Sequence, residues 1–198
     1  MLPESELLHD IKITFLGISN VGKTSIIKQF HDNTFEDSFV PTIGVEFLNH
    51  TMSIDGNRFC VKLLDTAGQE KYRSLSGVYL RDSDGCVFVF DLTNSNSFKE
   101  LPFYFTIYQE NLYELPPVLL LGNKSDLSEN MITDKEINQM MTKYHISNYF
   151  EVSALTGTNI RESIECLIRD IVIHNRKKTE KNSVSIIDYG DKKQKSCC

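Results

Sequence analysis

The sequence predicts an α/β fold, a doubly wound, mostly parallel six-stranded sheet with helices on both faces. Two observations predict it. Apolar runs of strand length alternate along the chain with segments whose apolar residues recur at helical spacing, as in the β-α units of a parallel sheet. Polar clusters follow directly after four of these runs, at residues 17–24, 65–69, 123–126 and 153–155. Because ligands of such sheets bind at the carboxyl ends of the strands, we expect these clusters to form one crevice.

The first strand and the first helix flank a glycine-rich stretch. Ile11–Leu16 is a strand-like apolar run, and the residues after Thr24 have apolar positions at helical spacing. Between them, Gly17–Thr24 matches the phosphate-binding pattern G-x-x-x-x-G-K-[ST] without a mismatch. We expect its backbone N–H groups to cradle the phosphates of a nucleotide, Lys23 to reach the β- and γ-phosphates, and Thr24 to ligate Mg²⁺. The expected phosphate-binding residues are Gly17, Ser19, Asn20, Val21, Gly22, Lys23, Thr24 and Ser25.

The remaining strands follow in order. Residues 31–39 are polar with aromatic interruptions and are expected to form a loop. Two strands, Ile43–Ile54 and Arg58–Leu64, are separated by Asp55–Gly56–Asn57, which favours an antiparallel hairpin. The next two strands are expected at Cys86–Phe90 and Pro117–Gly122, where continuous apolar runs indicate burial on both faces. A short strand is expected at Tyr149–Val152.

Three further helices have recognisable starts or stripes. Ser97 with Glu100 predicts a capping box for a helix whose first turn Pro102 makes irregular. A second box, Thr133 with Glu136, predicts the next helix. The last helix is expected from about Asn159 to Asn175, on the strength of one apolar stripe.

Length and charge limit the class of protein. The chain has 198 residues and a formal net charge of −6, which suits one soluble domain and argues against a protein that lives on nucleic acid. No apolar run is long enough to cross a bilayer, and Met1–Glu6 lacks the features of a signal peptide. We therefore expect a protein made and kept on the cytosolic side.

Three regions are expected along the chain: an N-terminal extension at 1–10, the folded domain at 11–175, and a disordered tail at 176–198. The tail carries seven Lys and Arg residues against three Asp and Glu residues. A basic tail on an acidic body suggests approach to an anionic membrane surface, although a merely solvated tail is the alternative.

Taken together, the motifs resemble those of the small GTPases, and within them the Rab family. The resemblance covers roughly residues 11–175 and the final pair of cysteines. Each motif is short and weak evidence alone, but the combination of motifs is specific for this family. Besides residues 17–24, they are Pro41–Phe47, Asp65–Glu70, Lys71–Leu75, Phe90–Thr93, Asn123–Asp126, Ser153–Ala154 and the terminal Cys197–Cys198.

The resemblance implies roles for the hydrolytic residues. Asp65 is expected to hold Mg²⁺ through a water, and Thr42 to complete the metal shell when the γ-phosphate is present. Gly68 is expected to donate its backbone N–H to that phosphate, and Gln69 to orient the attacking water. Gln69, Lys23 and Thr42 are thus the expected catalytic residues.

Guanine selection is expected at the last two clusters. The Asp126 carboxylate can accept hydrogen bonds from N1–H and the exocyclic amino group of guanine, a pairing that adenine does not offer. The resemblance assigns the other base contacts to Asn123, Lys124, Ser153, Ala154, Leu155 and Phe35.

The sequence also departs from the family pattern. Leu155 stands where the family usually has lysine, and its apolar side chain can keep the wall of the base site. Leu64 stands where Rab proteins almost always have tryptophan, so only Phe47 and Tyr79 remain of three aromatic residues on the effector surface, which also includes Ile43. Residues 81–85 depart from the family's usual continuation as well.

The resemblance implies a slow GTP hydrolase that binds GTP or GDP with Mg²⁺ and acts as a switch in vesicle trafficking. The implied partners are an exchange factor, an activating protein, effectors, and the prenyl-transfer and extraction factors that would handle Cys197 and Cys198. A monomer on the cytoplasmic face of an endomembrane is expected. Two alternatives stay open, a nucleotide-binding scaffold that no longer hydrolyses and a P-loop kinase, although intact Gln69 and Asn123–Asp126 argue against them.

Overall fold

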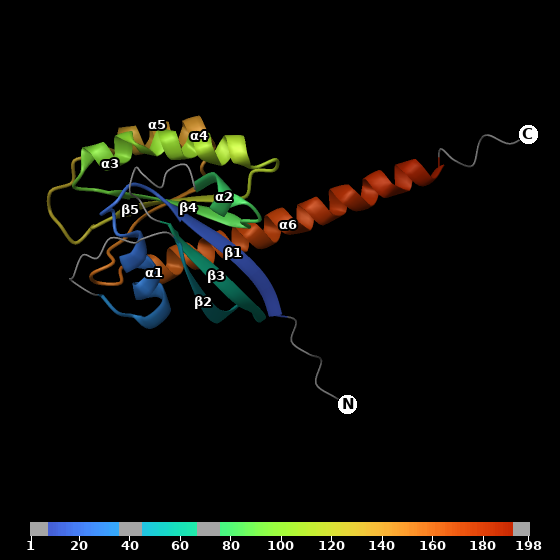
Figure 1. The fold of residues 1–198 in the computed structure, drawn as a ribbon, viewed down its shortest axis with the longest axis horizontal. Coiled ribbons are helices and arrows are strands. Elements are labelled where there is room, and N and C mark those ends of the chain that lie inside the picture. The colour runs from blue at the N-terminus through green and yellow to red at the C-terminus, as the bar shows by residue number, and fades with distance from the viewer. Residues whose placement is uncertain (1–7, 36–44, 67–75, 192–198) are drawn as a thin grey trace, which may run out of the picture.

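The structure is a computed structural model that describes residues 8–35, 45–66 and 76–191. Its centre is a six-stranded sheet in the order β2-β3-β1-β4-β5-β6 (Figure 1). The first three strands along the chain are β1 (Leu8–Leu16), β2 (Val45–Ile54) and β3 (Asn57–Thr66). The last three are β4 (Gly85–Asp91), β5 (Val118–Asn123) and β6 (Asn148–Glu151).

Only the β2–β3 pair is antiparallel, and it runs in register from Val45 opposite Thr66 to Ile54 opposite Asn57. All other neighbours in the sheet are parallel. The predicted hairpin is confirmed, with Asp55 at φ 50° and Gly56 at φ 79° supplying the left-handed turn. The fold class predicted from the sequence is therefore confirmed.

Helices cover both faces of the sheet (Figure 1). One face packs on α1 (Lys23–Asp32) and α6 (Ile160–Asp191), whose apolar side chains join those of β1 and β3 in a single buried cluster. The other face packs on α2 (Ser76–Leu80), α3 (Ser95–Lys99), α4 (Leu101–Asn111) and α5 (Asp134–Tyr144). The sheet is thus buried between two layers, as continuous apolar strands require.

The start of α3 differs from the sequence prediction. Asn94 is the N-cap, and its side chain accepts hydrogen bonds from the backbone of Asn96 and Ser97. The Ser97 hydroxyl instead accepts a 2.9 Å hydrogen bond from the backbone N–H of Asp91, so the Ser97–Glu100 capping box is wrong. The helix breaks at Glu100, and α4 begins again with Pro102 in its first turn. This break agrees with the irregularity that Pro102 predicted for the start of the helix. The Thr133–Glu136 box at α5 is confirmed.

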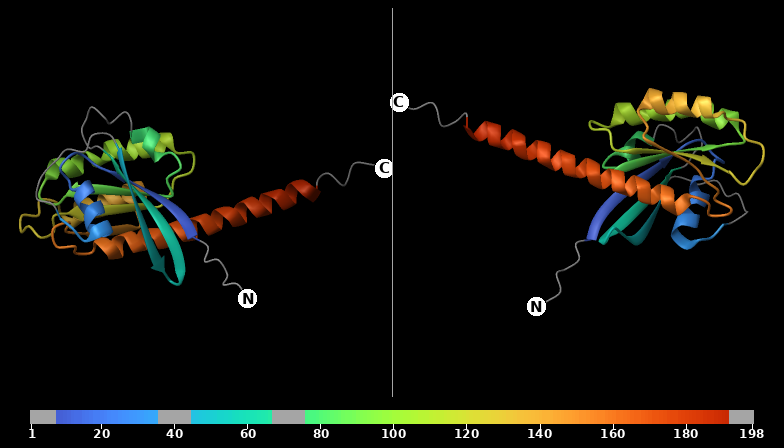
Figure 2. Two further views of the ribbon diagram at one scale, coloured as in Figure 1. Left: turned by 60° about the horizontal axis from the view of Figure 1, so that its bottom comes forward. Right: turned by 180° about the vertical axis from the view of Figure 1, so that it is seen from behind.

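The last helix is longer than predicted. The sequence predicts an end near Asn175, but α6 continues to Asp191. Glu114 supports the continuation from the loop before β5, because its carboxylate lies 2.6 Å from Lys178 Nζ and 3.8 Å from His174 Nε2. Beyond this point, the helix extends away from the sheet (Figure 2). Across the described ranges, no helix is both long enough and apolar enough to cross a membrane.

Candidate functional site

The turn between β1 and α1 is held in a conformation that needs its glycines. Gly17 has φ 148°, and a Cβ there would lie 2.3 Å from the carbonyl oxygen of Val89. Gly22 has φ 91°, and a Cβ there would lie 2.2 Å from Asn123 Nδ2. Asn20 takes the left-handed region at φ 67°, which asparagine tolerates better than most residues. The tight turn expected from the phosphate-binding pattern is therefore present.

Lys23 lies inside this turn. The residue is 5% exposed, and its Nζ donates hydrogen bonds to the carbonyl oxygens of Gly17 at 2.9 Å and Ile18 at 3.0 Å. Burial lowers the pKa of its ammonium group to about 8, although the nearby Asp65 carboxylate opposes this shift. A desolvated cation of this kind gains from an anionic ligand, which is what phosphate oxygens would supply.

Thr24 and Asp65 meet between α1 and the end of β3. The Thr24 hydroxyl donates to Asp65 Oδ2 at 2.5 Å, and Asp65 is 1% exposed. The neighbouring Thr66 hydroxyl fixes the strand end by donating to the carbonyl oxygen of Phe15 at 2.6 Å. A hydroxyl and a carboxylate are the hard oxygen ligands that Mg²⁺ takes, so this pair fits the metal that the sequence implies. Thr42, the third expected ligand, lies outside the described residues.

Asn123, at the end of β5, joins two loops that are far apart in the sequence. Its Nδ2 donates to the carbonyl oxygen of Val21 at 2.8 Å. Its Oδ1 accepts a hydrogen bond from the backbone N–H of Ala154 at 3.1 Å. Asn123 is 2% exposed, and both of its partners are buried. One side chain therefore fixes the phosphate-binding turn relative to the 153–155 cluster.

Asp126 is held by the same cluster. Its Oδ1 accepts a hydrogen bond from the Ser153 hydroxyl at 2.5 Å, and Ser153 Oγ in turn accepts one from the backbone N–H of Thr156 at 3.1 Å. The Asp126 side chain is exposed, so an oriented carboxylate faces solvent beside the buried Ala154 backbone. This is an arrangement that can accept paired N–H groups from a base.

Lys124 has a partner that the sequence analysis did not assign. Its Nζ lies 2.7 Å from Asp91 Oδ2, at the end of β4, and its backbone is left-handed at φ 68°. The position of Asp91 at the end of a predicted strand was visible in the sequence, but nothing there indicated which residue it would contact. The contact depends on the order of the strands in the sheet, because Asp91 in β4 is paired with Asn123 in β5, next to Lys124.

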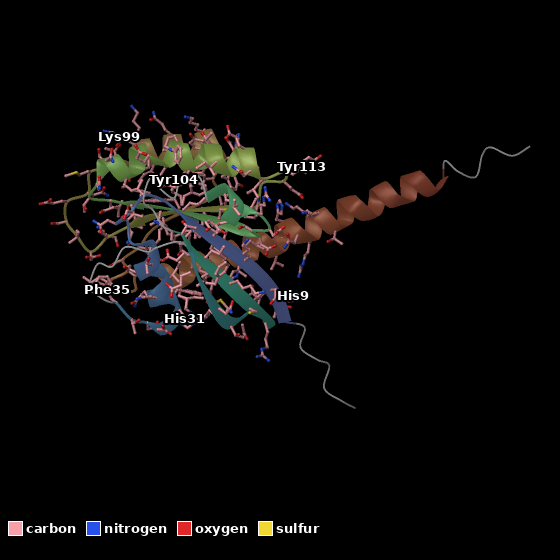
Figure 3. All side chains as sticks on the ribbon, viewed as in Figure 1. His9, His31, Phe35, Lys99, Tyr104 and Tyr113 are labelled. Carbon is pink, nitrogen blue, oxygen red and sulfur yellow. The ribbon has the colours of Figure 1, made fainter. Side chains whose placement is uncertain are left out.

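Two expected base contacts are exposed side chains. Phe35 follows the end of α1 (Figure 3). Phe35 is 39% exposed, and Leu155 is 54% exposed. Ala154, which lies between Ser153 and Leu155, is 4% exposed. Both side chains thus offer exposed apolar surface, as stacking on a base requires.

The expected effector surface is only partly present. Phe47 on β2 is 61% exposed, and Tyr79 on α2 is half-buried. Leu64, which is paired with Phe47 across the β2–β3 hairpin, is 1% exposed, so it packs in the core and adds nothing to the exposed surface at Phe47. The remaining predicted residues lie outside the described ranges: Thr42, Ile43, Gly68, Gln69, Cys197 and Cys198.

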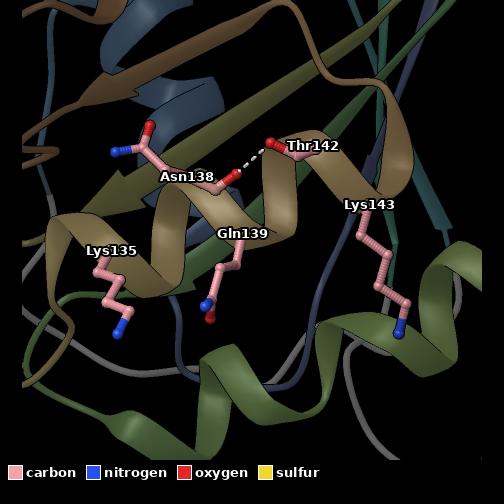
Figure 4. A pocket seen from close by; sticks show the side chains of 5 residues that line it. All are labelled: Lys135, Asn138, Gln139, Thr142 and Lys143. Atoms are coloured by element: carbon pink, nitrogen blue, oxygen red, sulfur yellow. Dashed lines mark hydrogen bonds between the residues drawn. The ribbon is translucent and has the colours of Figure 1, made fainter.

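A separate hollow lies along α5, and none of the predicted site residues lines it (Figure 4). Its lining side chains are exposed: Lys135, Asn138, Gln139, Thr142 and Lys143. Among the described residues, those predicted to bind phosphate, metal and base lie instead at the carboxyl ends of β1, β3 and β5 and after β6, apart from Phe35.

Comparisons with known proteins show which family the chain belongs to. The Ras family model matches residues 12–173. The chain is 32% identical to human Ras-related protein Rab-37 over 94% of this chain and 85% of that protein. It is 37% identical to Ras-related protein Rab-27B of Rattus norvegicus, over 88% of this chain and 85% of that protein. It is 38% identical to Ras-related protein Rab-32D of Dictyostelium discoideum, over 82% of this chain and 74% of that protein.

Proposed function

Because the chain belongs to the Rab proteins of the Ras family, and is thus a small GTP-hydrolysing enzyme, we propose that it acts as a membrane-anchored switch in vesicle trafficking. In this proposal, the site at the strand ends binds GDP or GTP together with Mg²⁺. The switch would lie in the loops that contain Thr42 and Gly68, ordered when a γ-phosphate is bound and released after hydrolysis.

The observation that carries the nucleotide site is the position of Asn123. Its two hydrogen bonds, to Val21 and Ala154, connect a turn suited to phosphates with a loop suited to a base. These loops are separated by more than 100 residues, so local folding of either one does not explain the link. A ligand that has phosphates at one end and a base at the other supplies a reason for it.

The phosphate end has charge and donors in place. Lys23 presents a buried ammonium, and the turn from Gly17 to Gly22 has the backbone conformation of an anion-binding loop. We propose that Thr24 and Asp65 hold Mg²⁺, together with Thr42. When bound, the metal neutralises charge on the phosphates. Gln69 would orient the attacking water, and an activating protein would supply the stabilising charge that the chain lacks.

The base end favours guanine. Asp126 is oriented by Ser153, and a carboxylate accepts two N–H donors from guanine but meets only one donor and an acceptor on adenine. Phe35 and Leu155 would enclose the rings. A site that leaves a polar group unpaired with the wrong ligand discriminates strongly, so we propose GTP rather than ATP as substrate.

Membrane attachment is proposed through prenylation of Cys197 and Cys198. One lipid chain gives marginal, reversible binding, whereas two anchor a protein stably, and neighbouring lysines add attraction to anionic lipid. This places the protein on the cytoplasmic face of an endomembrane, cycling through the cytosol. The proposed partners are an exchange factor, an activating protein, extraction and prenyl-transfer factors, and effectors, acting on a monomer.

The test begins with purified protein and fluorescent GDP in buffer with Mg²⁺. We expect GTP and GDP, but not ATP, to displace the probe, and protein loaded with GTP to release phosphate slowly. The Asp126→Asn variant should lose guanine nucleotide while keeping its fold by circular dichroism. Equal displacement by ATP and GTP, or phosphate release that Asp126→Asn leaves unchanged, would contradict the proposal.

A further inference from the structure

We propose that Asp91 is a positioning residue for the guanine site, and that it acts through Lys124. This inference rests on the proposed function, because it concerns the same nucleotide site. The observation that carries it is the 2.7 Å contact between Asp91 Oδ2 and Lys124 Nζ, in which the aspartate side chain is 6% exposed and the lysine side chain 30% exposed.

The aspartate is fixed before it meets the lysine. Its Oδ1 accepts hydrogen bonds from the backbone N–H of Thr93 at 2.9 Å and from the Thr93 hydroxyl at 2.7 Å. Its backbone N–H donates to Ser97 Oγ at 2.9 Å, and the Ser97 hydroxyl in turn donates to the carbonyl oxygen of Asn94 at 2.6 Å. Oδ2 is therefore presented by a rigid strand end, in the position where a cation can reach it.

The lysine needs this support because of where it lies in the chain. Lys124 follows Asn123, which holds the phosphate-binding turn, and precedes Asp126 by two residues. Its φ of 68° is a conformation that side chains with a Cβ rarely adopt and that costs free energy. A charge-assisted hydrogen bond from Lys124 to Asp91 offsets this cost and fixes the segment that carries the base-reading carboxylate.

Two backbone hydrogen bonds connect the end of β5 and the segment after it to the chain on either side. The backbone N–H of Leu92 donates to the carbonyl oxygen of Asn123 at 3.0 Å, and that of Ser125 donates to the carbonyl oxygen of Val152 at 3.1 Å. Asp91 therefore acts on a segment that is tied to both neighbouring strands. Loss of its charge would free Lys124 and loosen Asp126 without removing any atom from the base site.

The experiment measures the dissociation rate of fluorescent GDP from full-length protein in buffer with Mg²⁺. Asp91→Asn should release GDP about tenfold faster, as expected for a partly exposed charge-assisted pair. The same substitution in a Lys124→Ala background should change the rate by less than about twofold, because its partner is gone. An equal acceleration in both backgrounds would show that Asp91 acts through the Thr93 turn and would overturn the inference.

Conservative and control variants complete the test. Asp91→Glu keeps the charge but displaces the oxygen that Thr93 contacts, so release should stay within about threefold of wild type. Thr93→Val removes the hydroxyl bond to Asp91 Oδ1 but keeps the backbone N–H bond and the Asp91–Lys124 pair, so its release rate should lie between those of wild type and Asp91→Asn. If circular dichroism shows that Asp91→Asn does not fold, GDP release from the Asp91→Glu variant tests the inference instead. Release from Asp91→Glu that is tenfold faster than from wild type would overturn the inference. If wild-type protein binds no GDP, the proposed function itself fails, whereas normal binding with an unaffected Asp91→Asn variant removes only the role of Asp91.

Discussion

Replacing Asn123 with alanine tests the link between the phosphate turn and the base loop. The change removes two hydrogen bonds, at 2.8 Å to the carbonyl oxygen of Val21 and at 3.1 Å from the N–H of Ala154. Val21 and Ala154 are 1% and 4% exposed, so both backbone groups would be left buried without this partner. An unsatisfied buried polar group costs about 1–3 kcal/mol, so the two groups together give a loss of roughly 2–6 kcal/mol in the free energy of unfolding. That is a large part of the ~5–15 kcal/mol that stabilises a typical domain.

The assay is urea unfolding of GDP-loaded protein at fixed GDP concentration, together with GDP dissociation. Asn111→Ala is the matched control, because Asn111 Nδ2 also donates to a carbonyl oxygen at 2.8 Å but on the exposed surface of α4. We expect the control to lose at most about 0.5 kcal/mol. A loss below about 1 kcal/mol for Asn123→Ala, with unchanged GDP dissociation, would refute the reasoning that this side chain holds the two loops together.

Three further predictions follow from single positions. Gly22→Ala should abolish the binding of fluorescent GDP, because a Cβ there would lie 2.2 Å from Asn123 Nδ2. Gly56→Ala is the control: Gly56 also has a positive φ, 79°, but a Cβ there meets open space, so this variant should lower stability and leave GDP binding intact. Leu64→Trp should destabilise the protein by about 1–3 kcal/mol in thermal unfolding, because the site is 1% exposed; an unchanged melting temperature would contradict the burial. Burial, and then the charges of His31 and Arg161, lower the pKa of His50 from its ordinary value of 6.5, and Asp32 opposes this shift. The contribution of His50 to stability is therefore full above pH 6.5 and is lost as the pH falls through the pKa of the folded state. The His50→Gln variant should reduce this pH dependence when urea unfolding is compared at pH 7 and pH 5.

The order of strands and helices could be predicted because it depends on patterns that are local and repeated. Alternating apolar runs predicted the parallel sheet, and Asp55–Gly56 predicted the hairpin with its left-handed turn. The capping box at Thr133 and Glu136 was also predicted, since its two hydrogen bonds join residues three positions apart.

The box at Ser97 and Glu100 was wrong although it has the same local pattern. The difference is tertiary: the Ser97 hydroxyl is buried against the backbone of Asp91 at the end of β4, and Asn94 was available to cap the helix in its place. Leu64 is a second case that local sequence does not decide, because a leucine on a hairpin strand can face either the core or the solvent. The structure shows that Leu64 is buried. The Asp91–Lys124 pair needed the order of β4 and β5, which no local pattern supplies.

The extra length of α6 changes how the proposed lipid anchor would act. Between Ile160 and Gly190 the sequence contains neither glycine nor proline, so it has no strong signal to end the helix, even though its apolar stripe fades after Ile171. Glu114 holds the helix at His174 and Lys178, and the stretch from there to Asp191 spans roughly 20 Å at the helical rise per residue. A flexible tail would let the domain turn freely above a membrane, whereas a helix fixed to the domain transmits its direction to the segment that precedes Cys197. The domain would then approach a membrane in a restricted range of orientations, set by the contact between Glu114 and α6.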